Sequence, residues 1–141
     1  MVMCTTPPFR AAVRLNSGVR PVHKHFDDLA RKCDQDEVLR SEDLDELCSL
    51  TGLNRDDLFD SLADYIARRF ASNDLSFETS GAVMNFLWAE SLFGLSGFAK
   101  DVFLAFDDGE HLPSGASPDT DPVGKYTRPQ IAGLIARRAQ V

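Results

Sequence analysis

Hydrophobic residues recur every three or four positions along most of this chain, which is the spacing of α-helices with one buried face. The clearest case is the run Phe59, Leu62, Ala63, Ile66 and Phe70. The same spacing predicts helices near residues 23–33, 41–50, 54–71, 76–95, 96–109 and from 127 onward. Since no stretch alternates as a strand does, we expect an all-α fold, an irregular bundle of about six helices.

Capping residues set the expected helix ends. Ser41, Asn54 and Ser76 stand where N-cap residues belong, and Gly52 stands at a left-handed C-cap position. Residues 127–130, Thr-Arg-Pro-Gln, match a capping box before the last helix. Residues 110–126 are rich in Gly, Pro, Ser and Asp, which predicts one long loop before that helix.

The segment from Gly81 to Leu95 is apolar nearly all round, and its polar interruptions are Asn85, Glu90 and Ser91. A helix without a polar face is normally surrounded by others, so we expect this one to be central and to end at Gly94. Asn85 should bond backbone groups across the bundle, and Glu90 should pair with an arginine, Arg68 or Arg69, or be exposed. The side chains expected to be mostly buried are Phe70, Met84, Leu87, Trp88 and Phe103.

Charge is distributed unevenly along the chain, whose net charge is −7. Residues 1–22 carry +3 and are interpreted as a poorly ordered tail before a single helical domain over residues 23–141. Residues 27–64 hold 13 of the 22 acidic residues. Such a body repels nucleic acid and anionic membranes and suits a basic protein partner, although plain solubility also explains it. The oligomeric state stays open.

Three cysteines, Cys4, Cys33 and Cys48, are too few and too scattered for a disulfide framework. Cys33 and Cys48 fall on apolar helix positions, where cysteine behaves as a small hydrophobic residue. This usage favours a reducing, cytoplasmic location.

Leu44 to Ala63 resembles a helix-turn-helix, with Gly52 in the turn and Leu53 directly after it. The resemblance implies a DNA-binding regulator, but residues 42–63 contain seven acidic residues and one base, Arg55. Each phosphate contact needs a base, so charge disfavours DNA binding. A tight helical hairpin within the bundle is the preferred interpretation.

Residues 107–111, Asp-Asp-Gly-Glu-His, place carboxylates near an imidazole. Asp107, Asp108, Glu110 and His111 could bind a metal ion or transfer protons, but their spacing matches no ligand motif, and a helix end entering a loop is favoured. We therefore assign no metal, no cofactor and no catalytic residue.

The leading functional hypothesis is a small protein-interaction module with an acidic helical surface, such as an inhibitor, an antitoxin or an immunity-like protein. The residues expected to contact the basic partner are Asp45, Glu46, Asp56 and Asp60. The alternative is an enzyme that uses Glu90 or the cluster from Asp107 to His111, with Asn85 as a further polar candidate. A DNA-binding regulator is the third hypothesis.

Overall fold

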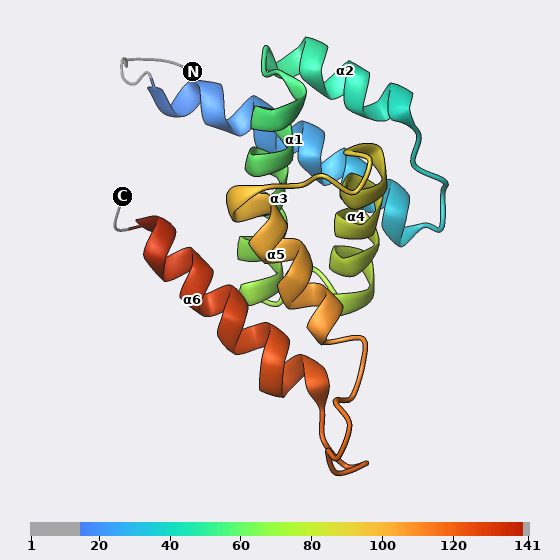
Figure 1. Cartoon of the computed structure of the whole chain (residues 1–141). Coiled ribbons are helices and arrows are strands. Elements are labelled where there is room, and N and C mark those ends of the chain that lie inside the picture. Colours follow the sequence, from blue (N-terminus) through green and yellow to red (C-terminus); the bar gives the residue numbers. More distant parts are fainter. Residues whose placement is uncertain (1–14, 140–141) are drawn as a thin grey trace.

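The computed structural model describes the backbone of residues 15–139 and the side chains of residues 23–139. Within that part, six α-helices follow one another, and a short π-helix, η1, precedes the last (Figure 1). Their bounds are α1 Leu15–Asp34, α2 Ser41–Thr51, α3 Arg55–Ala71, α4 Phe77–Glu90, α5 Gly97–Asp108, η1 Val123–Thr127 and α6 Arg128–Ala139. The predicted all-α bundle is confirmed over these residues. Each of these helices is too short or too polar to cross a membrane.

The first helix begins earlier than its hydrophobic spacing predicts. α1 starts at Leu15, whereas the apolar positions predict a helix from about His23. The tail expected over residues 1–22 therefore overlaps the start of α1, and residues 1–14 lie outside the described part of the chain.

α3 is the helix at the centre of the bundle. It contacts each of the other five α-helices, and in Figure 1 α5 lies in front of it, with α2 across the top. The eight buried residues of α3 are Leu58, Phe59, Leu62, Ala63, Tyr65, Ile66, Ala67 and Phe70. The prediction that residues 81–95 form the central helix is therefore wrong, because α4 packs on α1, α3 and α5 with one side left open.

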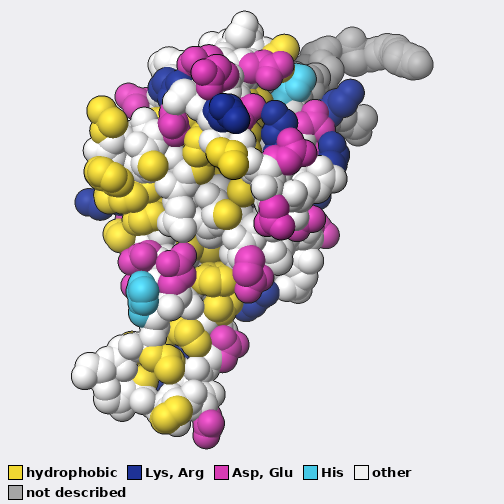
Figure 2. Space-filling view, turned by 90° about the vertical axis from the view of Figure 1, so that its right-hand side faces the viewer, with side chains coloured by type: hydrophobic (Ala, Val, Ile, Leu, Met, Phe, Trp, Pro, Cys, Tyr) yellow, Lys and Arg dark blue, Asp and Glu magenta, His cyan; other side chains and the backbone are white. Residues whose placement is uncertain are grey.

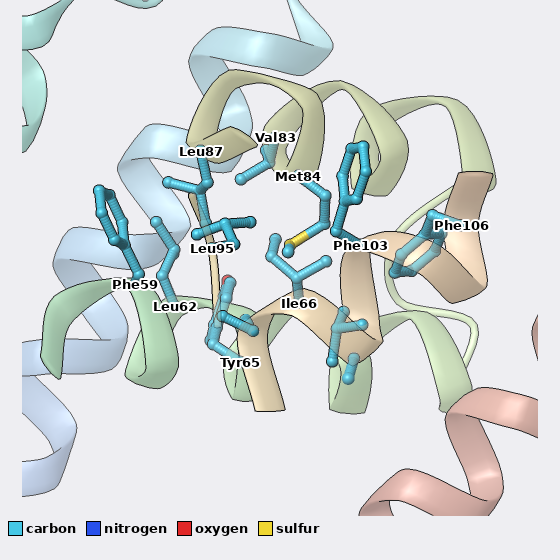
Figure 3. Packing of buried hydrophobic residues seen from close by; sticks show 14 of the residues in the cluster. Phe59, Leu62, Tyr65, Ile66, Val83, Met84, Leu87, Leu95, Phe103 and Phe106 are labelled. Atoms are coloured by element: carbon cyan, nitrogen blue, oxygen red, sulfur yellow. The ribbon is translucent and has the colours of Figure 1, made fainter. Parts of the chain in front are cut away.

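The core fills the space between α3, α4 and α5. The side chains that meet there include Leu62 and Ile66 of α3, Val83, Met84 and Leu87 of α4, and Phe103 and Phe106 of α5 (Figure 3). Burial is confirmed for four of the five core residues expected from sequence, Phe70, Met84, Leu87 and Phe103. Trp88 is less completely buried than these four, but it packs against the same core cluster.

Several local end signals are confirmed. Asn54 Oδ1 accepts the N–H of Asp57 at 2.8 Å, and Ser76 Oγ accepts the N–H of Thr79 at 3.0 Å. Gly52 ends α2 with a φ of 76°, in the left-handed region that favours glycine. The helical hairpin expected over residues 44–63 is therefore present, but its second helix is the buried α3.

The capping box expected at Thr127 is wrong, because both of its residues bond α5 instead. Thr127 Oγ1 is buried and donates to the carbonyl oxygen of Ala105 at 2.7 Å, and Gln130 Nε2 donates to Asp108 Oδ2 at 3.0 Å. Gly109 makes room for this joint, since a Cβ there would overlap Thr127 Oγ1 and lie 2.8 Å from the Phe77 ring. α6 is thus fixed to α5 by its N-terminal end.

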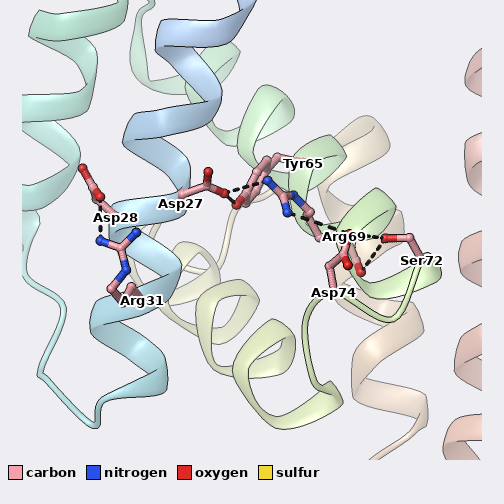
Figure 4. A network of polar contacts seen from close by, with 7 residues as sticks. All are labelled: Asp27, Asp28, Arg31, Tyr65, Arg69, Ser72 and Asp74. Carbon is pink, nitrogen blue, oxygen red and sulfur yellow. Dashed lines mark hydrogen bonds and ion pairs between the residues drawn. The ribbon is translucent and has the colours of Figure 1, made fainter.

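A polar network ties α1 to α3 (Figure 4). The carboxylate of Asp27 accepts hydrogen bonds from the Tyr65 hydroxyl and, at 3.0 Å, from Arg69. The guanidinium of Arg69 also lies 3.8 Å from Asp74, in the turn before α4, and 5.1 Å from the centre of the Tyr65 ring. These contacts connect helices across the outer side of α3, and their role is to stabilise helix packing.

Candidate interaction surface

One side of α4 faces away from the bundle. Ala82, Asn85 and Ala89 are exposed on it, and Phe86 is partly buried beside them. These residues recur at three and four positions, so they form one stripe along the helix. No charged residue occurs between Glu78 and Glu90, although an exposed helix face normally carries several. The open stripe is therefore unusually apolar for a surface in water.

Two large hydrophobic residues project from the turn between α4 and α5. Leu92 is 85% exposed and Phe93 is 67% exposed. Their φ values of 58° and 62° lie in the left-handed region, which costs a residue with a Cβ roughly 1–2 kcal/mol. α4 ends at Glu90, so the prediction that it continues to Gly94 is wrong, and Leu92 and Phe93 leave the core side for the surface.

Hydrogen bonds hold this turn. The N–H of Phe93 donates to the carbonyl oxygen of Trp88 at 2.8 Å, and the N–H of Leu92 donates to that of Ala89 at 3.0 Å. Ser91 Oγ donates to the same Trp88 oxygen at 2.9 Å. The two hydrophobic side chains are thus presented by a fixed backbone.

An aromatic stack connects the turn to α5. The rings of Phe93 and Trp88 have centroids 5.8 Å apart, and Trp88 stacks on Phe103 at 4.5 Å with an interplanar angle of 12°. Stacked aromatic side chains lose little conformational freedom when they contact a partner. We call the surface made by this group and the α4 stripe the apolar face; its residues are Ala82, Phe86, Trp88, Ala89, Leu92 and Phe93.

One end of the apolar face is acidic. Glu110 lies against α4, since a Cβ on Gly81 would be 3.7 Å from Glu110 Oε2. Glu78 is exposed in the first turn of α4, and Asp107 lies one turn beyond Phe103 on α5. Figure 2 shows hydrophobic side chains gathered directly above acidic side chains and a histidine. We call Glu78, Asp107 and Glu110 the acidic end.

Asp107, Glu110 and His111 have ligand atoms within 4.8 Å of one another. A carboxylate–imidazole group of this kind offers three donors to a divalent cation. Glu110 and His111 are exposed, and exposed groups like this are common without an ion. Asp108 turns away from them to accept a hydrogen bond from Gln130, so the four polar candidates at this helix end do not act as one group. The cluster supplies negative charge at the end of the apolar face.

Glu90 joins three helices. Its carboxylate accepts a hydrogen bond from Ser41 Oγ at 2.6 Å and lies 3.5 Å from the Arg55 guanidinium. Ser41 was expected to cap α2 and Arg68 or Arg69 to pair with Glu90; both expectations are wrong, because α2 and the start of α3 pack against the end of α4. Asn85 is exposed on the open stripe and, among the described residues, makes no side-chain hydrogen bond, contrary to the expectation for it.

The four carboxylates expected to contact a partner do not share one surface. Asp45 Oδ1 accepts a hydrogen bond from Arg55 at 2.7 Å. Asp60 accepts the N–H of Ala99 at 3.2 Å, at the start of α5, and its other oxygen lies 3.6 Å from Arg138. These two carboxylates are therefore engaged in contacts between helices.

The other two carboxylates line different hollows. Glu46 borders a hollow of about 390 Å³ between α1 and α2, whose apolar floor includes Leu29 and Leu47. Asp56 borders one of about 220 Å³ between the start of α3 and the start of α5. The acidic character of α2 and α3 is therefore spread around the molecule.

The shifted pKa values follow from ion pairs and burial. Lys32 Nζ lies 2.9 Å from Asp43 Oδ1, and this hydrogen bond and its charge raise the pKa of Lys32. Burial alone would raise the pKa of Asp43, but Lys32 and the backbone N–H of Arg40 together lower it. The hydrogen bond to Asp45 raises the pKa of Arg55, and burial raises that of Cys33. Asp43, Lys32 and Arg55 take part in contacts between helices.

The sequence prediction missed Leu92 and Phe93 as surface residues. Both were counted with the buried helix, because each is apolar and follows a helical run. The available signal was Ser91, a residue type that favours helix ends and turns, followed by two large apolar residues directly before Gly94.

Comparisons with protein-family models, with curated proteins and with solved structures find no match to this chain.

Proposed function

We propose that this protein is an interaction module that binds a partner protein through the apolar face. The observation that carries this proposal is the pair Leu92 and Phe93, 85% and 67% exposed in left-handed backbone conformations. Single exposed hydrophobic residues are ordinary, but a contiguous apolar patch marks an interaction site. Residues held at a conformational cost cluster at functional positions. Trp88, beside Phe93, adds the residue type most enriched at the energetic centres of interfaces.

The partner in this proposal is basic. The chain carries a net charge of −7, and opposite charge speeds the encounter of two proteins. Asp45, Glu46, Asp56 and Asp60 then contribute to the overall field, since they are spread over several sides. An inhibitor, antitoxin or immunity-like protein is the specific form of this function that fits a small acidic domain.

A capture experiment with matched variants tests the proposal. The full chain is immobilised as wild type, as Leu92→Ser/Phe93→Ser, and as Val38→Ser, whose hydrophobic side chain is 76% exposed in the α1–α2 connection. We expect a basic protein from the native host to be retained by the wild type and Val38→Ser and lost from the double variant. Equal retention by the double variant, with its circular dichroism unchanged, would place the binding surface elsewhere.

A further inference from the structure

The chemistry of the partner segment follows from the shape and charge of the apolar face, and this inference rests on the proposed function. We propose that the occupant is an amphipathic α-helix of the partner, with an apolar stripe and basic residues at one end. It packs along α4 as one more helix of the bundle. Its basic end lies at the acidic end, and its apolar end covers Leu92 and Phe93.

The outline of the face fits a helix. The open stripe runs from Ala82 to Ala89 on α4, about 10 Å at the rise of an α-helix, and the exposed Leu92 and Phe93 extend it. Ala82 and Ala89 lie two turns apart, and their small side chains allow the ridge of a second helix to approach α4 closely beside Phe86. Between residues 15 and 139 there is no sheet edge that an extended peptide could join.

The apolar character of α4 supports the same occupant. The sequence of α4 is that of a helix covered on every side, yet the chain leaves one side uncovered. A further helix would give α4 the surroundings that its composition indicates. It would also remove Leu92 and Phe93 from water, which is the main gain in free energy at such contacts.

Charge sets the direction of the bound helix. On α5, exposed Lys100 lies one turn before Phe103, and Asp107 lies one turn after it. Glu78 and Glu110 add to the negative charge at the Asp107 side, whereas Glu90, at the other end of α4, is paired with Arg55. Basic residues are therefore favoured at the acidic end and repelled at the Lys100 end.

A second copy of this chain fits the face less well. Two copies would each bring a net charge of −7 and would repel one another. Beside the apolar face, each copy offers Lys100 to meet the three carboxylates of the acidic end. A heterologous basic helix satisfies those carboxylates without that repulsion.

A displayed library of 18-residue helical peptides provides the probe. The library places leucines on one stripe and varies the charges at both ends of the helix independently. Selection on the full chain should return helices with Lys or Arg at one end only. Phe93→Ser should weaken their binding at least about tenfold, and Asp107→Asn/Glu110→Gln about three- to tenfold at low salt. Asp36→Asn/Glu37→Gln, an equal charge change at exposed positions elsewhere, should leave affinity unchanged.

The outcomes separate this inference from the proposed function. Peptides whose binding depends on Phe93 but that are extended, acidic or indifferent to Asp107 and Glu110 would overturn the helix assignment and leave the apolar face as an interaction site. Concentration-dependent dimers in sedimentation, abolished by Phe93→Ser, would assign the face to a second copy. Absence of any Phe93-dependent binder, together with a failed capture experiment, would overturn both.

Discussion

The composition of α3 and α4 suggests that α4 is the more buried helix, but in the structure α3 is more buried than α4. α4 has almost no polar face, whereas α3 contains seven charged residues among its 17. Yet α3 contacts every other α-helix, and α4 leaves Ala82, Asn85 and Ala89 in water. The charges of α3 lie away from its buried side, and there Asp64 pairs with Arg68 and Arg69 pairs with Asp27 of α1, so the apolar side of the helix can be enclosed.

This difference separates two properties that sequence reasoning tends to merge. The apolar fraction of a helix determines how much of its surface is unfavourable in water. The position of the helix in the fold determines how much of that surface the same chain buries. The apolar side of α3 is buried by the other helices of the fold. Part of the apolar surface of α4 stays unburied, and it lies next to the turn in which Leu92 and Phe93 adopt left-handed conformations. Contiguous apolar surface that a chain leaves exposed is a feature typical of interaction sites.

The largest test of the comparison is truncation of one phenylalanine in each helix. Phe70 of α3 is fully buried against Phe106 and Phe77, whereas Phe86 of α4 is partly exposed. We expect Phe70→Ala to lower the free energy of unfolding by roughly 3–5 kcal/mol, and Phe86→Ala by less than half as much. Urea unfolding measures both, and equal losses would show that α4 is as enclosed as α3.

A second test compares the polar groups of the same two helices. Tyr65 of α3 donates its hydroxyl to Asp27, whereas Asn85 of α4 faces solvent. Tyr65→Phe should cost about 1–2 kcal/mol because it removes a hydrogen bond to a charged acceptor, while Asn85→Ala should stay within about 0.5 kcal/mol of the wild type. Thermal melts suffice, and a marked loss from Asn85→Ala would mean that the stripe is covered within this chain.

The helices themselves could be predicted because their signals are local or periodic. The spacing from Phe59 to Phe70 depends on one helix, and the caps at Asn54 and Ser76 bond groups three residues away. Ser41 and Thr127 carry the same kind of signal, but Ser41 bonds Glu90, 49 residues on, and Thr127 bonds Ala105, 22 residues back. Such tertiary partners displace a local cap, and no local pattern records them.

The candidate surface was harder to predict from the sequence than the helices were. The chargeless run of α4 is visible in the sequence, but it predicts burial, and whether the same chain supplies that burial depends on how six helices pack. The aromatic stack from Phe93 through Trp88 to Phe103 joins residues on two helices and a turn. Asp45 and Asp60 could be recognised as acidic but not as paired with Arg55 and Arg138.

The charged contact between α1 and α2 should contribute less to stability at low pH. Asp43 and Lys32 join α2 to α1, and the lowered pKa of Asp43 means that its stabilising effect is present above the usual carboxyl pKa. That effect is lost as the pH falls through the lower pKa of the folded state. Asp43→Asn should therefore cost roughly 1 kcal/mol at pH 6 and progressively less below about pH 4. A constant difference across this range would show that the carboxylate charge is not what stabilises the contact.

A substitution in the turn after α4 should change stability in the opposite direction, as a gain. Phe93 is 67% exposed at a φ of 62°, so its side chain adds little to the core while its backbone is strained. Phe93→Gly removes the steric conflict but makes the unfolded chain more flexible, so the net change should range from zero to about 1 kcal/mol of added stability. The same variant should lose binding of a basic helical peptide, whereas Val38→Gly, at an exposed position elsewhere, should keep it. Denaturation and peptide titration of the two variants measure these effects separately. Greater stability with lost binding would show that this turn is kept in a costly conformation for a partner, as function often requires of a surface. Lower stability would instead show that Phe93 secures Trp88 within this chain and that the conformation of the turn carries no net cost.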